Sequence, residues 1–281
     1  MLLADHEDSG NRLRVLLLPA LSSISTREEM QPLAWQLDNE FITETLDWPG
    51  FGTNPRAQID WTTEILSDFL RDSLRRQSPA AIIAAGHAAA YTVHELAQRP
   101  GGVVCLILVA PTWRGPLPTM MGGRKGWFRH IVGALDNKVV GPLLYRLNVS
   151  QWVIRKMALE HVYSDAAWLT DARFQSKIAV TKGEGARHSS VRFVTGSLDR
   201  YADRDSFLED LSRIVCPVLI VYGAETPRRS RLEMELMSMF QDVTAVILEK
   251  GKLALHEEFA SSVAGVVMCF INANLRSDPP A

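Results

Sequence analysis

The stretch AAIIAAGHAAA, residues 80–90, decides the fold of this chain. Its first half is a continuous run of apolar residues, which is typical of a strand buried on both faces of a parallel sheet. Its second half is a turn of glycine and alanine, and a helix-period segment then extends from residue 88 to residue 98. A strand that turns directly into a helix predicts one β–α unit of an α/β fold.

The same pattern recurs on both sides of this stretch. Further short apolar runs lie at residues 13–18, 41–46, 103–110, 217–222 and 244–248. Helix-period segments accompany them at residues 59–76, 229–240 and 257–275. Strands and helices in alternation predict an α/β protein with a doubly wound, mostly parallel sheet.

The alternation is interrupted between residues 112 and 205. This segment has helix-like patterns and no convincing strand, and it carries 15 Lys and Arg against 8 Asp and Glu. We therefore expect a basic helical cap, residues 112–205, inserted between a first part of the core at 1–111 and a second part at 206–281. The alternative is an ordinary run of solvated helices with a chance excess of basic residues.

Composition and charge exclude several classes of protein. A formal net charge of −2 predicts no nucleic-acid partner. The three cysteines are far apart and lack metal-ligand spacing, so we expect no disulfide, no metal and no cofactor. The longest apolar run, residues 103–111, has about half of the ~20 residues that cross a bilayer. Residues 1–11 lack the basic start and apolar core of a secretory signal, so we expect a cytoplasmic protein without a transmembrane segment.

Four motifs resemble the α/β-hydrolase superfamily, in particular its lid-bearing esterases, epoxide hydrolases and C–C hydrolases. LLLPALSS at 16–23 ends the first strand, where the family usually has a His-Gly pair. DWPGFG at 47–52 matches the family's D-x-P-G-x-G loop, and CPVLIVYG at 216–223 resembles its late strand. AAGHAAA at 84–90 stands in the place of the G-x-S-x-G nucleophile elbow. The resemblance covers nearly the whole chain and implies the α/β-hydrolase fold with an inserted helical cap.

The resemblance also implies positions for a catalytic triad, and each of them carries another residue. Ala88 stands at the centre of the elbow, Thr226 in the place of the acid and Lys252 in the place of the histidine. We interpret His256 as a residue that caps or packs the final helix. Because a serine hydrolase needs a hydroxyl nucleophile, a base and an acid, ordinary Ser-His-Asp activity is not expected.

The pocket implied by the resemblance is expected to remain. The backbone N–H groups of Leu21 and Ala89 occupy the implied oxyanion-hole positions, where they would hold a carbonyl or carboxylate. The candidate ligand-binding residues are Leu21, His87, Ala88, Ala89 and Lys252.

Lys252 is open to three interpretations. It forms a structural salt bridge with Glu225, Glu249 or Glu257, or it anchors an anionic ligand. Alternatively, an apolar pocket lowers its pKa and makes it a base or a Schiff-base amine.

The cap contains a basic and aromatic stretch. Arg124, Lys125 and Arg129 cluster around Trp127 and Phe128, which suits contact with a membrane surface or an acidic protein. A flexible lid hinge with a solvated face is the alternative. The remaining tryptophans of the cap are expected to pack it against the core; they are Trp113, Trp152 and Trp168.

Two functional hypotheses follow. The leading one is a non-catalytic α/β-hydrolase homologue, a pseudo-hydrolase that binds an unidentified small molecule or protein through its pocket or its basic cap. The alternative is an active hydrolase or lyase with a non-standard site around Lys252 and water as the nucleophile. Whether the chain is an enzyme is thus left open by its sequence.

Overall fold

A computed structural model describes residues 12–54, 56 and 59–275; the start of the chain, on which the absence of a secretory signal was predicted, lies outside these residues. Its centre is a six-stranded sheet in which every neighbouring pair is parallel, with the order β2-β1-β3-β4-β5-β6. The strands are β1 (Arg14–Leu18), β2 (Ile42–Thr45), β3 (Ala81–Ala85), β4 (Cys105–Val109), β5 (Val218–Gly223) and β6 (Val243–Leu248). The predicted doubly wound parallel sheet is confirmed.

The strands differ in burial between the centre and the edges of the sheet. Every residue of β3, β4 and β5 is buried, because these central strands are covered on both faces. The edge strands β2 and β6 expose part of their residues to solvent.

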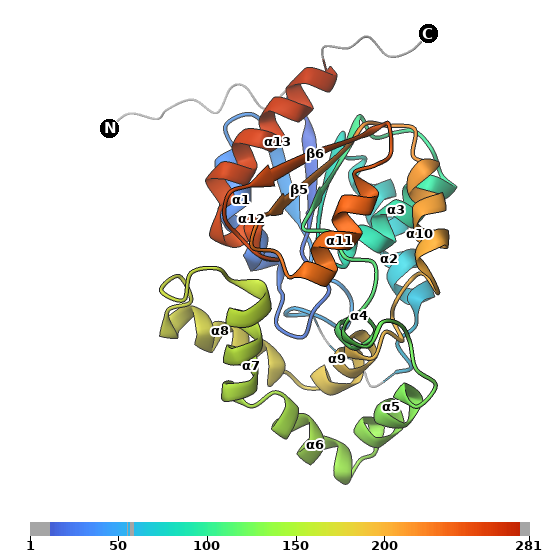
Figure 1. Ribbon diagram of the computed structural model, residues 1–281, viewed down its shortest axis with the longest axis vertical. Helices are drawn as coiled ribbons and strands as arrows, with labels where there is room; N and C mark the ends of the chain where they lie inside the picture. Colours follow the sequence, from blue (N-terminus) through green and yellow to red (C-terminus); the bar gives the residue numbers. More distant parts are fainter. Residues whose placement is uncertain (1–11, 55, 57–58, 276–281) are drawn as a thin grey trace.

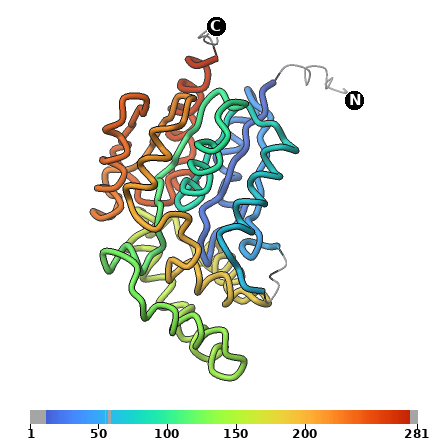
Figure 2. The backbone as a smooth tube through the Cα atoms, turned by 90° about the vertical axis from the view of Figure 1, so that its right-hand side faces the viewer, coloured from blue at the N-terminus to red at the C-terminus, as the bar shows by residue number. Residues whose placement is uncertain are grey.

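Helices cover both faces of the sheet (Figure 1 and Figure 2). One face carries α1 (Gln31–Leu37), α12 (Leu255–Glu258) and α13 (Ala260–Leu275), and the other carries α2 (Thr63–Gln77), α3 (Ala88–Gln98), α10 (Arg204–Ser212) and α11 (Arg228–Met237). The helix predicted at 257–275 begins earlier and is interrupted at Phe259.

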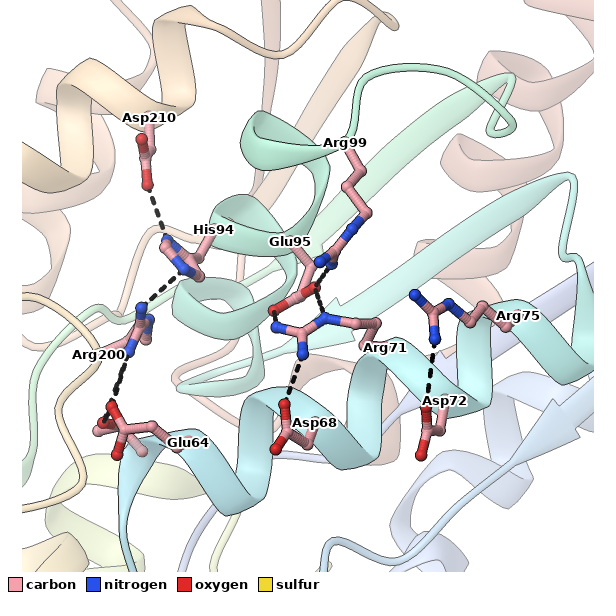
Figure 3. Close-up of polar contacts among 11 residues, drawn as sticks. Glu64, Asp68, Arg71, Asp72, Arg75, His94, Glu95, Arg99, Arg200 and Asp210 are labelled. Carbon is pink, nitrogen blue, oxygen red and sulfur yellow. Dashed lines mark hydrogen bonds and ion pairs between the residues drawn. The ribbon is translucent and has the colours of Figure 1, made fainter.

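A set of polar contacts fastens the helices of the second face to one another (Figure 3). Arg71 of α2 donates two hydrogen bonds to the buried carboxylate of Glu95 of α3, at 3.1 and 3.2 Å. His94 of α3 contacts Asp210 of α10 at 3.0 Å and Arg200 at 2.7 Å. These contacts connect one helix to the next, and their role is structural.

Residues 112–205, all of which the structure describes, contain helices and no strand. Up to α10, they form α4 (Pro116–Met121), α5 (Phe128–Asp136), α6 (Val140–Asn148), α7 (Gln151–Met157), the π-helical turn η2 (Ala158–Val162), α8 (Asp171–Thr181) and α9 (Ala186–Val194). We refer to α4–α9 as the helical segment. It lies beyond the carboxyl ends of the strands (Figure 1). Among the described residues, no helix has both the length and the apolarity to span a bilayer.

Backbone contacts join the helical segment to the core loops. The carboxylate of Glu258 accepts hydrogen bonds from the N–H groups of Ser164, at 2.9 Å, and Asp165, at 2.6 Å. The N–H group of Ala254 donates to the carbonyl of Val162 at 3.1 Å. These contacts hold the loop after β6 against η2 and the turn before α8.

Candidate functional site

The turn between β3 and α3, residues 85–88, has the shape of a nucleophile elbow but a different centre from the predicted one. The left-handed residue is Gly86, with φ of +52°, whereas Ala88 is the first residue of α3. A Cβ atom at Gly86 would lie 3.0 Å from the Cβ atom of Ala20. The assignment of Ala88 as the centre is therefore corrected by two residues, because the sharp turn needs the residue that tolerates positive φ.

The predicted oxyanion-hole donors are corrected as well. The N–H group of Ala89 donates to the carbonyl of Gly86, at 3.2 Å, within the first turn of α3. The N–H group of Ala20, one residue before the predicted Leu21, donates to Glu29 Oε1 at 2.8 Å. Leu21 itself is a buried core residue. The carboxylate of Glu29 therefore already accepts the hydrogen bond of the N–H group of Ala20, shortly after β1.

His87 is buried beside this turn. Its Nε2 atom lies 3.5 Å from Asp199 Oδ1, and its ring packs against Phe193. Burial lowers the pKa of His87 to about 4 and raises the pKa of Asp199 to about 7. At neutral pH His87 is therefore an uncharged residue of the core.

The other two predicted triad positions point elsewhere. Thr226 is buried, and its hydroxyl has no hydrogen-bond partner among the residues that the structure describes. Lys252 Nζ donates to the carbonyl of Leu159 in η2 at 2.5 Å. The predicted partner Glu225 is close enough for the charge of Lys252 to contribute to its lowered pKa, after hydrogen bonds from Ser164 and Gly251.

The principal cavity lies to one side of all these positions. Its volume is about 1410 Å³, and it is bordered by the loops after β1 and β2, by α8 and by Glu257. The predicted ligand-binding residues Leu21, His87, Ala88, Ala89 and Lys252 are not among the residues that line it. The prediction that these residues face the pocket is wrong, since the first four are buried in the core and Lys252 turns to Leu159.

Opposite charges balance in the lining of the cavity. Its basic residues are Arg56, Arg173, Lys177 and Arg187, and its acidic residues are Glu28, Glu29, Glu184 and Glu257. Aromatic rings of Trp35 and Trp168 also border it. With four charged residues of each sign, the lining carries no large net charge.

Three of these charged residues come together at the wall of the cavity. Lys177 Nζ of α8 lies 3.1 Å from Glu257 Oε2 and 3.7 Å from Glu29 Oε2. Behind them, His256 Nε2 lies 3.3 Å from Glu29 Oε1, and the Tyr163 hydroxyl donates to Glu257 Oε2 at 2.7 Å. We call these five residues the Glu29 cluster. They come from the turn after β1, from the helical segment and from the segment after β6, which meet only in the folded chain.

The charges in the Glu29 cluster stabilise one another. Burial by itself would raise the pKa of Glu29, but the contact with His256 and the charge of Lys177 lower it below its usual value. Burial would lower the pKa of Lys177, but Glu257 and Glu29 raise it. Burial and the nearby Glu257 raise the pKa of the Tyr163 hydroxyl. At neutral pH the cavity wall therefore presents ionised Glu29 and charged Lys177.

His256 is packed in the interior, in agreement with one of its two predicted roles, and it also contacts Glu29. It is 2% exposed, and neither ring nitrogen has a well-aligned hydrogen bond among the described residues, although Nε2 points to Glu29. Its role is electrostatic, because it helps to keep Glu29 ionised.

Sequence reasoning missed Glu29 and Lys177 and named Glu257 only as a partner of Lys252. A signal existed for Lys177, which shares the buried side of α8 with Phe174, Ile178 and Thr181. A lysine on the apolar face of a helix is unusual unless it is paired. Glu29 gave a weaker signal, because it stands in a short polar turn where charged residues are ordinary.

Solved structures of similar fold come from several enzymes. The haloalkane dehalogenase DbeA from Bradyrhizobium elkani USDA94 is 14% identical and has a TM-score of 0.72, with 96% of this chain and 93% of that chain covered. The enol-lactonase from Burkholderia xenovorans LB400 is 14% identical, with a TM-score of 0.69 and 95% and 94% covered. A serine hydrolase involved in carbazole degradation is 13% identical, with a TM-score of 0.69 and 94% and 92% covered. No curated protein matches the chain in sequence.

These comparisons correct the leading functional hypothesis. The prediction of a non-catalytic pseudo-hydrolase is contradicted, because the structural neighbours are named as catalytic hydrolases, among them dehalogenases and an enol-lactonase. The alternative hypothesis, an active hydrolase or lyase with a non-standard site, fits them better. The hypothesis rested on three positions, and charged residues at other positions border the cavity.

The family of the chain follows from its sequence profile together with its fold. The profile of the alpha/beta hydrolase family matches residues 15–265, which include every strand of the sheet except the first residue of β1. The chain belongs to the alpha/beta hydrolase family.

Proposed function

We propose that this protein is an active hydrolase whose chemistry is carried by the Glu29 cluster. The observation that carries the proposal is the meeting of Glu29, Lys177 and Glu257 at the wall of the 1410 Å³ cavity. In open α/β sheets, ligands bind outside the carboxyl ends of the strands, and Glu29 and Glu257 follow the carboxyl ends of β1 and β6. The site differs from the predicted one around Lys252, although His256 and Glu257 belong to the same segment.

Each member of the cluster has a distinct role in this proposal. Ionised Glu29 accepts a proton from a water molecule, which attacks the carbonyl carbon of an ester or lactone. The ammonium group of Lys177 stabilises the negative charge that develops on the carbonyl oxygen. The proton passes to the leaving oxygen, so that one water is consumed and an acid and an alcohol are formed.

Three further groups fix the position of these two. The N–H group of Ala20 and the ring of His256 hold Glu29 Oε1, which leaves Oε2 toward Lys177. Tyr163 holds Glu257, and Glu257 in turn holds Lys177. This arrangement keeps the two reacting groups ionised and oriented before a substrate binds.

The helical segment has the role of a cap in this proposal. It supplies Lys177 and Tyr163, and its residues 168–187 form one wall of the cavity. We therefore retain the division into a core of residues 1–111 and 206–281 with a cap at 112–205. Substrates without net charge are favoured by the balanced lining. The cytoplasmic location and the absence of a nucleic-acid partner stay predictions from composition.

The test is the hydrolysis of a panel of short- and medium-chain p-nitrophenyl esters and simple lactones by the wild type, by Glu29→Gln and by Glu28→Gln. Glu28 is a matched control, since it precedes Glu29 in the same turn and also borders the cavity. We expect turnover by the wild type, a loss of about 100-fold or more in kcat for Glu29→Gln, and little change for Glu28→Gln. Absence of wild-type turnover across the panel, or equal activity of the two variants, would overturn the proposal.

A further inference from the structure

The outer face of α6 is apolar and exposed. Val140, Leu143 and Leu147 are 48%, 62% and 61% exposed, and Val139, just before the helix, is 84% exposed. Their spacing of three and four residues places them on one side of the helix. The opposite side packs inward, where Gly141 is buried. The stripe is therefore an apolar surface that the fold of this chain leaves uncovered.

Helix α6, which carries the stripe, lies at the end of the molecule farthest from the sheet (Figure 1 and Figure 2). Trp152, at the start of the neighbouring helix α7, is 72% exposed. The prediction that Trp152 packs the cap against the core is wrong, whereas Trp113 is buried against Phe207 and Trp168 stacks on Tyr163. A protruding helix with an exposed tryptophan beside it can reach a flat surface without hindrance from the core.

The residues around the stripe are strongly basic. Residues 124–156 contain seven Lys and Arg and one acidic residue, Asp136. Asp136 is already paired with Arg192, at 2.7 Å, and with His188, at 2.6 Å. Lys138, just before α6, and Arg146, next to Leu147, are exposed. Arg155 and Lys156 are paired with Asp171 and Glu160, at 2.7 and 3.8 Å. Among the described residues, Lys138 and Arg146 therefore supply the unpaired positive charge next to the apolar stripe.

The three basic residues predicted for the cap surface lie in two environments. Lys125 and Arg129 are exposed. Arg124 donates a hydrogen bond to the carbonyl of Gly196, so its guanidinium is partly engaged within the protein. Lys156 of α7 lies 5.5 Å from the ring of Trp152, which joins the cation to the aromatic part of the surface.

We propose that the α6 stripe with Trp152 docks on the surface of an anionic lipid bilayer. The apolar side chains enter the boundary between headgroups and acyl chains, and Lys138 and Arg146 contact lipid phosphates. A second copy of the chain fits this surface less well, because pairing two stripes would bring the surrounding cations of both copies together. The docking surface is distinct from the proposed hydrolase site, because neither the residues of the stripe nor Trp152 are among those that line the cavity.

The proposal is tested by co-sedimentation of the full chain with two kinds of vesicle. One contains phosphatidylcholine alone, and the other contains about 30 mol% phosphatidylglycerol, which supplies negative surface charge. We expect binding to the anionic vesicles only, and release in about 0.5 M NaCl, where charges are screened within a few ångströms. Equal binding to both vesicles, or none to either, would overturn it.

Two sets of variants assign the contact to this surface. The double variant Leu143→Asp/Leu147→Asp is expected to bind anionic vesicles at least about tenfold more weakly, because it removes the inserted apolar area. Lys138→Gln and Arg146→Gln are each expected to weaken binding about fivefold. Val215→Asp is the matched control, since Val215 is 70% exposed but precedes β5 at the amino end of the sheet. Both sets should retain the circular dichroism spectrum of the wild type.

The oligomeric state decides between a bilayer and a second copy. Sedimentation velocity without lipid is expected to show a monomer for the wild type and for Leu143→Asp/Leu147→Asp. A wild-type dimer that this variant dissociates, together with no effect of the variant on vesicle binding, would assign the stripe to self-association and overturn the proposal.

Discussion

The turn between β3 and α3 and the Glu29 cluster both lie at the carboxyl ends of the strands. The turn consists mainly of small apolar residues, whereas the cluster consists of charged and polar residues. The turn keeps the left-handed backbone of a nucleophile elbow, but Gly86 and Ala88 give it no reactive group. The Glu29 cluster has no motif in the sequence, but it places ionised side chains against a cavity. The backbone of the elbow and the charged residues that border the cavity are therefore found after different strands of the same sheet.

The largest expected effect comes from Lys177→Met, which changes the Glu29 cluster and leaves the turn between β3 and α3 intact. This variant leaves the buried Glu29 and the partly buried Glu257 without their cation, which costs about 3–5 kcal/mol of unfolding free energy. Urea unfolding measures this loss, and the same preparation should have lost its esterase activity.

Lys177→Arg is the companion variant, because it keeps the charge with a different shape. It should recover most of the stability and only part of the activity. A Lys177→Met protein that is as stable as the wild type would show that the cluster is not coupled as described.

A second large effect is expected on the pH dependence of the unfolding free energy, through Asp199, which lies beside His87. Burial raises the pKa of Asp199 from 3.8 to about 7, against a hydrogen bond from Gly115 and the charges of Arg124 and Arg114. The folded state therefore holds this proton more tightly than the unfolded state does. The unfolding free energy of the wild type should fall between pH ~4 and pH ~7, by on the order of 2–4 kcal/mol for this one residue.

Asp199→Asn measures this contribution, because an amide oxygen can still accept the hydrogen bond from Gly115. Unfolding curves at several pH values should show the variant gaining stability relative to the wild type as the pH rises to 7. A constant difference between the two proteins over this range would mean that Asp199 titrates normally.

The sequence predicted the fold far better than it predicted the site. The strands were predictable because continuous apolar runs such as 80–85 have few other uses in a protein of this composition. The position of the elbow was missed by two residues, since glycine and alanine at 84–90 satisfy the steric pattern in more than one register. The Glu29 cluster was not predictable as a unit, because Glu29, Lys177 and Glu257 meet through tertiary contacts across more than 200 residues.

A smaller effect is expected from placing serine in the turn. Gly86→Ser puts a side chain at positive φ, with its Cβ atom 3.0 Å from that of Ala20, and should cost about 1–2 kcal/mol of unfolding free energy. Neither Gly86→Ser nor Ala88→Ser should raise esterase activity, since the neighbouring His87 is buried with its Nε2 atom directed to Asp199 and to the Leu198 carbonyl. A serine-dependent gain that phenylmethylsulfonyl fluoride abolishes would return the chemistry to the turn.

The most direct test of the central claim is the ratio of kcat/KM between Glu29→Gln and Lys252→Ala, measured side by side on the ester that the wild type hydrolyses fastest. Lys252 Nζ is engaged by the Leu159 carbonyl and does not line the cavity, so Lys252→Ala should remain within about threefold of the wild type. Glu29→Gln should lose about 100-fold or more. The opposite result, activity lost in Lys252→Ala and kept in Glu29→Gln, would contradict the assignment of the chemistry to the Glu29 cluster.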